Sequence, residues 1–115
     1  MTVFVIHKPQ PRAGAYDVSS AVEFGEIEYV FEDTFIPYRD PKRAEEIAYQ
    51  KLRQFNSDED FLLWAGGDPV ALIIASMVAG FATDGCIKVL RWDRVRDSMS
   101  KELLGGKYVP ITLDI

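Results

Sequence analysis

The sequence contains one cysteine, Cys86, and one histidine, His7, among its 115 residues. A single thiol forms no intramolecular disulfide, which excludes a disulfide-stabilised mini-protein and favours a reducing, intracellular location. A single histidine excludes zinc motifs built on several histidines. A Ser–His or Cys–His pair would depend on His7 alone, and no Gly-x-Ser-x-Gly motif accompanies it. We therefore expect no catalytic residue, no metal and no cofactor.

Long hydrophobic segments are also lacking. The longest, Pro69–Ala82, has 14 residues, whereas a helix needs about 20 to span a bilayer. We interpret it as a buried helix, and we expect no membrane association. The first residues show no basic start followed by a long apolar run, so no signal peptide is expected.

The charge balance is only mildly acidic, with 13 Lys and Arg against 18 Asp and Glu and a net charge of −5. This argues against general nucleic-acid binding, which needs a basic surface, and the excess is too small for a DNA mimic. The charges are nevertheless segregated, with only acids from Asp17 to Asp33 and mostly bases from Lys88 to Lys107. Such runs are usually solvated faces, salt-bridged within the monomer. The alternative is a pair of partner-binding surfaces, with the candidates Glu23, Glu26, Glu28, Glu32, Arg91, Arg94 and Arg96.

Hydrophobic residues make up 48% of the sequence, which is typical of a globular protein. The length allows one domain, residues 1–115. Residue patterns predict strands at Thr2–His7, Glu26–Phe31, Phe61–Ala65, Cys86–Trp92 and Tyr108–Ile115. The continuous apolar run of the third predicts a central strand buried on both faces. Pro110, which cannot donate a ladder hydrogen bond, places the last strand at an edge.

Two helices separate these strands. Asp40-Pro41 and Asp68-Pro69 both have the cap-then-proline signature of a helix start. The first helix is amphipathic and extends to Phe55, whereas the second, through Ala82, has Ser76 as its one polar side chain and is expected to be covered on several sides. A short turn is expected from Ser19 to Phe24, a loop over Gln10–Ala15, and a basic loop or short helix over Arg94–Gly106.

The predicted fold is an α/β domain with a five-stranded mixed sheet and the order β-β-α-β-α-β-β. The strand-helix-strand-helix-strand portion is expected to form right-handed parallel crossovers. The final pair of strands is expected to be antiparallel.

The best candidate ligand site is Gly66-Gly67-Asp68, between the central strand and the second helix. Ligands in open α/β sheets bind beyond the carboxyl ends of strands, at helix N-termini. The commoner interpretation is a tight turn in which Asp68 caps the helix. The segment matches neither phosphate-loop pattern, and Asp68 would repel a phosphate.

Two further features have structural and functional interpretations. Asp58-Glu59-Asp60 contains potential hard-metal ligands, but a solvated turn before the strand is the expected structure. Trp64 and Trp92 are expected in the core; if exposed, they would be interaction anchors.

Several short motifs together resemble a group of small uncharacterised proteins encoded by tailed phages, especially short-tailed phages of marine and aquatic bacteria. These motifs are Val3-Phe4-Val5-Ile6, Ser20 to Glu26, Asp60 to Leu63 with Gly67-Asp68-Pro69, Leu90 to Arg94, and Tyr108-Val109-Pro110. They touch roughly half of the chain, whereas Val95–Gly106 is longer than the connector expected there. The resemblance implies a phage gene acting in the cytoplasm of an infected bacterium, and it carries no catalytic residue.

We therefore expect a small, non-enzymatic phage accessory protein that binds a bacterial or phage protein, with a homodimer also possible. The alternative is a small-ligand or nucleotide-binding module, possibly an enzyme, that uses the Gly66-Gly67-Asp68 turn.

Overall fold

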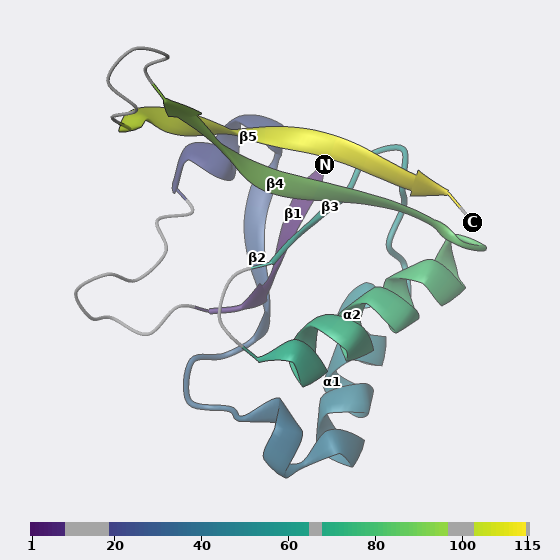
Figure 1. Ribbon diagram of the computed structural model, residues 1–115. Helices are drawn as coiled ribbons and strands as arrows, with labels where there is room; N and C mark the ends of the chain where they lie inside the picture. Colours follow the sequence, from purple (N-terminus) through teal and green to yellow (C-terminus); the bar gives the residue numbers. More distant parts are fainter. Residues whose placement is uncertain (9–18, 65–67, 97–102, 115) are drawn as a thin grey trace.

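The computed structural model describes residues 1–8, 19–64, 68–96 and 103–114. Five strands form one mixed sheet in the order β2-β1-β3-β4-β5 (Figure 1). The strands are β1 (Thr2–His7), β2 (Glu26–Phe31), β3 (Phe61–Leu63), β4 (Cys86–Arg96) and β5 (Leu103–Asp114). The helices are α1 (Pro41–Leu52), α2 (Pro69–Ala82) and the short 3-10 segments η1 (Ser19–Phe24) and η2 (Pro37–Arg39). The predicted α/β class and the order β-β-α-β-α-β-β are confirmed.

Strand directions follow the connections. β1 is parallel to both β2 and β3, and β3 is parallel to β4. The β4–β5 hairpin is antiparallel, as predicted. All three residues of β3 are buried, which confirms a central strand covered on both faces. Pro110 lies on the edge strand β5 and is paired with Leu90 of β4. An edge strand has a neighbour on one side only, so it tolerates a residue without a backbone N–H.

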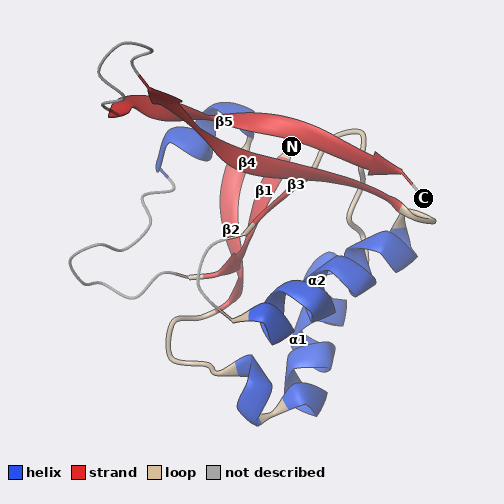
Figure 2. Ribbon diagram, in the orientation of Figure 1, coloured by secondary structure: helices blue, strands red, loops and turns tan. Residues whose placement is uncertain are grey.

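Alternation along the strands divides the core into two layers, one on each face of the sheet. Phe4, Ile6 and Leu62 belong to the cluster that α1 and α2 complete. Val3, Val5, Phe61 and Leu63 belong to the cluster on the other face, which includes Ala21 of η1. Figure 2 shows α1 and α2 on the same side of the sheet. Each face of the sheet is thus covered by a different part of the chain.

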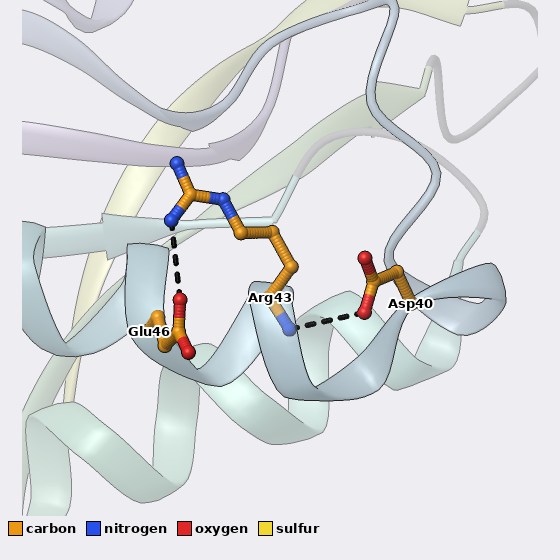
Figure 3. A network of polar contacts seen from close by, with 3 residues as sticks. All are labelled: Asp40, Arg43 and Glu46. Carbon is orange, nitrogen blue, oxygen red and sulfur yellow. Dashed lines mark hydrogen bonds and ion pairs between the residues drawn. The ribbon is translucent and has the colours of Figure 1, made fainter.

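The first helix begins where the sequence predicts. The Asp40 carboxylate accepts a hydrogen bond from the Arg43 backbone N–H at 3.2 Å, and Pro41 occupies the first turn. The Arg43 guanidinium donates to Glu46 at 3.1 Å, one turn further on (Figure 3). The helix ends at Leu52, earlier than predicted, although Phe55 beyond its end is still buried. The cap satisfies one backbone donor that the helix itself leaves free.

The expectation of a basic loop or short helix over Arg94–Gly106 is wrong in the described part of that range. β4 continues to Arg96 and β5 begins at Leu103, so the hairpin is longer than predicted at both strands. The ring centroids of Trp92 and Tyr108 are 4.9 Å apart. The Trp92 ring also lies over Gly106, where an added Cβ would be 2.6 Å from the ring. A cross-strand aromatic that covers a glycine supports the extended ladder in this part of the hairpin.

Other expectations fall partly or wholly outside the described residues. The loop over Gln10–Ala15 and the glycines Gly66 and Gly67 belong to this group, as do Ala65 and Ile115. The turn from Ser19 to Phe24 is described and is the 3-10 segment η1, as predicted.

Gly25 and Gly80 give a matched test of the packing. Gly25 has φ +152°, and a Cβ there would lie 2.7 Å from the Met1 carbonyl oxygen. We predict that Gly25→Ala lowers the free energy of unfolding by about 2 kcal/mol or more, through backbone strain and overlap.

Gly80 lies in α2, where a Cβ would be 3.4 Å from the nearest Ile87 atom. Gly80→Ala should raise the free energy of unfolding by up to about 1 kcal/mol, because alanine favours helix. Chemical denaturation measures both, and equal effects would contradict the described backbone at Gly25.

Candidate functional site

The Asp68 carboxylate caps α2. Its Oδ1 accepts a hydrogen bond from the Val70 backbone N–H at 2.9 Å, and Pro69 occupies the first turn. Its Oδ2 is buried and has no hydrogen-bond partner within the described part of the chain. Gly66 and Gly67, the other two candidate ligand residues, lie outside the described residues. Asp68 therefore acts as a helix cap. Its carboxylate occupies the position at the helix N-terminus where a phosphate would bind.

The acidic turn before β3 has a structural role. Asp60 accepts from the Thr2 backbone N–H at 3.1 Å and from the Asn56 backbone N–H at 3.0 Å. These bonds join the start of β1 to the turn before its neighbour, β3. Across the described ranges, no group of three or more His, Cys, Asp or Glu side chains is placed to hold a metal ion.

His7 is held by backbone carbonyls. Its Nε2 lies 3.1 Å from the Glu32 carbonyl oxygen and 3.0 Å from that of Phe35, so an Nε2–H can donate to either. The ring also meets Phe31 edge-on, with centroids 6.3 Å apart. His7 thus ties the end of β1 to the turn that follows β2.

The four candidate acids are exposed, and two of them form ion pairs within the chain. Glu28 lies 3.6 Å from Lys51 of α1, and Glu32 lies 3.8 Å from Lys8. Glu23 is in η1, and Glu26 begins β2. Since Glu26 and Glu28 are two residues apart on one strand, both lie on the face of the sheet that carries α1. Exposed pairs of this kind stabilise a fold by about 0–1 kcal/mol.

The candidate bases lie on a different strand from those acids. Arg91, Arg94 and Arg96 are in β4, which two strands separate from β2, whereas Glu23 lies in η1, which contacts β5 as well as β1 and β2. Arg91 is exposed, and for Arg94 and Arg96 the backbone alone is described. Glu26 and Glu28 therefore lie on a different part of the sheet from Arg91, whereas Glu23 lies on a segment that contacts the β4–β5 hairpin.

The expected burial of both tryptophans is wrong. Trp64 is 53% exposed and Trp92 is 40% exposed. Trp64 follows the last residue of β3, beyond the buried part of that strand. Trp92 lies on β4 beyond Val89 and Leu90, the two positions that pair with β3. Both side chains therefore lie where the sheet no longer covers them.

The expectation that α2 is covered on several sides is also wrong. Its buried residues are Ala71, Ala75 and Ala79, spaced four apart. Ile73, Met77 and Phe81, also spaced four apart, are 56%, 68% and 91% exposed. We call these three residues the outer face of α2. One layer of two helices covers the sheet (Figure 1). The alanines face inward and Leu72, Ile74 and Val78 are partly buried against the core, whereas the outer face of α2 is left uncovered.

A hollow adjoins this outer face. It has a volume of about 510 Å³ and lies between the C-terminal halves of α1 and α2. We call it the α1–α2 hollow. It is lined by Tyr49, Arg53, Met77, Val78, Phe81 and Ala82. Tyr49 is itself 58% exposed. The hollow is thus mainly apolar and carries one cation.

Sequence reasoning missed this surface, although the sequence contains a signal for it. Alanines recur every fourth residue at positions 71, 75 and 79, and large apolar residues recur every fourth residue at positions 73, 77 and 81. Small residues on one face let two helices approach closely. A helix with one small face and one large face therefore indicates that the large face is not the one packed against its neighbour.

The cap at Asp68 can be tested with two substitutions. We predict that Asp68→Ala lowers the free energy of unfolding by about 0.5–2 kcal/mol relative to Asp68→Ser, because serine still offers an oxygen to the Val70 N–H. Both variants remove the buried Oδ2, so the difference between them isolates the cap. Thermal and urea unfolding measure it. Equal stability of the two variants would overturn the capping role and reopen the turn as a ligand site.

Within the described residues, no helix is both long and apolar enough to cross a membrane. No significant match is found among curated proteins or among solved structures. A family model, described as Phage Pam3 gp32-like protein, matches residues 1–114. The expected phage origin is confirmed by this match: the chain belongs to the Phage Pam3 gp32-like protein family.

Proposed function

We propose that the chain is a non-enzymatic phage accessory protein that binds a protein partner through the outer face of α2. The observation that carries this proposal is the exposure of three large apolar side chains, Ile73, Met77 and Phe81, in one row beside a hollow. Contiguous exposed apolar patches beyond a few hundred Å² are rare on monomers and mark interaction sites.

The composition of the patch fits protein recognition. Tyr49 and Phe81 are aromatic, Met77 is flexible, and Arg53 is the cation at the rim. Aromatic residues, Met and Arg are the types enriched where proteins contact one another. We place the protein in the cytoplasm of the infected bacterium, with a phage or bacterial protein as the partner.

The acidic residues have a secondary role in this proposal. Glu23 and Glu26 are exposed and take part in neither of the two ion pairs described for the acidic segment. Negative charge attracts a basic partner and speeds encounter more than it increases affinity. We assign them to steering and the outer face of α2 to affinity.

A nucleotide-binding module at Gly66-Gly67-Asp68 is the weaker candidate. The described part of that turn offers a carboxylate, already used as a helix cap, and no basic side chain. A nucleotide that bound the folded chain would raise its melting temperature by mass action. A thermal-shift screen against nucleotides therefore separates the two functions.

Phe81→Asp tests the proposed surface. Phe81 is almost fully exposed, so the fold should survive the substitution and partner capture from a lysate of infected bacteria should fall at least about tenfold. Val22→Asp is the matched control, since Val22 is 60% exposed in η1, on the other face of the sheet. Proteins captured by the wild type and by the control variant, but not by Phe81→Asp, are identified by mass spectrometry. Capture of the same proteins by all three would remove the outer face of α2 from the interface.

Reversing charge tests the steering role separately. We predict that Glu23→Lys with Glu26→Lys slows association at low ionic strength and leaves the dissociation rate nearly unchanged. The difference should shrink near about 0.5 M salt, where charges are screened beyond a few Å. Surface plasmon resonance with the captured partner measures both rates. Association that is unchanged at low salt would exclude these acids from the encounter.

A further inference from the structure

We infer that the far part of the β4–β5 hairpin binds single-stranded nucleic acid, with a nucleobase stacked on Trp92 and phosphates attracted by the basic residues around it. We call this part the hairpin ribbon: residues 91–96 of β4 and 103–109 of β5. This surface is separate from the outer face of α2 and adds a second activity to the proposed function. The strand pairing, the charge and the position of Trp92 support it.

The hairpin ribbon continues beyond the strand that supports the rest of the hairpin. The described pairing of β3 with β4 ends at Leu63 and Leu90, whereas β4 and β5 remain paired as far as Arg96 and Leu103. Figure 1 shows both long strands continuing past β3. At about 3.4 Å per residue, β4 extends about 17 Å from Arg91 to Arg96. The ribbon is therefore long enough to contact a few nucleotides.

The ribbon is basic, although the chain as a whole is acidic. Residues 91–96 and 103–109 contain four basic residues and one acid, a net charge of +3, so the other residues of the chain carry −8. The overall charge of −5 therefore conceals a local basic segment. Positive charge confined to one segment attracts a polyanion there, while the acidic remainder repels it. This distribution favours a short contact over a long wrapped strand.

The strand register places positive charge on the same face as Trp92. Because side chains alternate along a strand, positions 92 and 94 share one face of β4, and Asp93 belongs to the other. The residues paired with Trp92 and Arg94 are Tyr108 and Gly106, which carry no charge. The one acid of the ribbon is thus on the face opposite Trp92.

Trp92 is fixed in place and still exposed. Its ring packs on Gly106, where an added Cβ would lie 2.6 Å away, and meets Tyr108 at an interplanar angle of 70°. Tyr108 is 8% exposed and forms a buried support, whereas Trp92 remains 40% exposed. An aromatic ring that is positioned before binding loses little conformational freedom when a nucleobase stacks on it.

An exposed aromatic ring favours single strands over duplexes. Nucleobases in a duplex are stacked on one another, whereas a single strand presents the face of each base. An acidic protein would satisfy the charge of the ribbon without using the ring. Stacking combined with charge neutralisation is how sequence-tolerant single-strand binding works. We expect little base preference and a Kd in the range of non-specific binding, about 10⁻⁴–10⁻⁶ M.

Titration with an oligothymidylate of about 12 nucleotides tests the stacking. In a Trp64→Phe background Trp92 is the one remaining tryptophan, and a stacked base should quench its fluorescence. With a labelled oligonucleotide, anisotropy should show that Trp92→Ala weakens binding at least about tenfold, whereas Trp92→Phe, which keeps a ring, stays within about threefold. Trp64→Ala is the matched control and should bind as the wild type does, because Trp64 is 53% exposed and lies outside the hairpin.

The dependence of affinity on salt measures the contribution of charge. For single strands, log K falls against log salt with a slope of about −0.7 for each phosphate neutralised. Arg94→Gln and Arg96→Gln should each reduce the steepness of that slope by about 0.7. Arg39→Gln, in η2, is the control and should leave the slope unchanged. Thermal unfolding confirms that each variant is folded.

Four results would overturn the inference. They are no binding at low ionic strength up to about 1 mM, tenfold above the weakest expected Kd; equal or tighter binding of a duplex, heparin or polyglutamate; binding that Trp92→Ala leaves unchanged; and binding without quenching of Trp92. If Trp92→Ala does not fold, the quenching and the slopes of the arginine variants decide. Phe81→Asp should bind the oligonucleotide as the wild type does, so failure of the proposed function is distinguishable from failure at the ribbon.

Discussion

The packing of α1 and α2 through alanines is the constraint on which the rest of this structure depends. Ala44 and Ala48 of α1 and Ala71, Ala75 and Ala79 of α2 all belong to one core cluster with the strands. Small side chains allow two helices to lie close together on one face of the sheet. The same arrangement places Ile73, Met77 and Phe81 on the side away from the sheet, where no further layer covers them in the described structure.

The largest fully buried side chains of the core lie outside α2, on β1, β2, β3, η2 and α1. Val3, Val5, Ile6 and Leu62 are among the largest fully buried side chains. Burying one side chain of this kind contributes about 1.5–3 kcal/mol, whereas a buried alanine contributes a single methyl group. The strands and α1 therefore supply the largest fully buried side chains, and α2 adds its alanines and the partly buried Leu72, Ile74 and Val78. This division leaves the outer face of α2 unconstrained by folding.

The sequence predicts those parts of the fold that local chemistry determines. Asp40 and Asp68 precede prolines, and both cap helices at those positions. Pro110 cannot serve a central strand, and it lies in an edge strand. The alternating residues of the strands identify both faces of the sheet. Each of these features depends on a residue and its immediate neighbours.

Features that depend on distant parts of the chain could not be predicted in the same way. Hydrophobicity counts Ala75 and Met77 alike, and only the position of α1 decides which of them is buried. The extent of the β4–β5 hairpin depends on cross-strand contacts such as Trp92 with Tyr108 and Gly106. The candidate binding surface also depends on where α1 lies, although the four-residue spacing of alanines and of large apolar residues along α2 is a signal for it in the sequence.

Phe81 is the residue for which folding offers the least explanation. Hydrophobic stabilisation scales with the apolar area removed from water, and 91% of Phe81 remains exposed in the folded chain. Its contribution to the free energy of unfolding is therefore small, while its exposure lowers solubility, a cost that the net charge of −5 partly offsets. We therefore assign Phe81 to the protein contact proposed above rather than to folding. Phe81 also lines the α1–α2 hollow together with Tyr49 and Arg53, so it belongs to the apolar surface on which the proposed function depends.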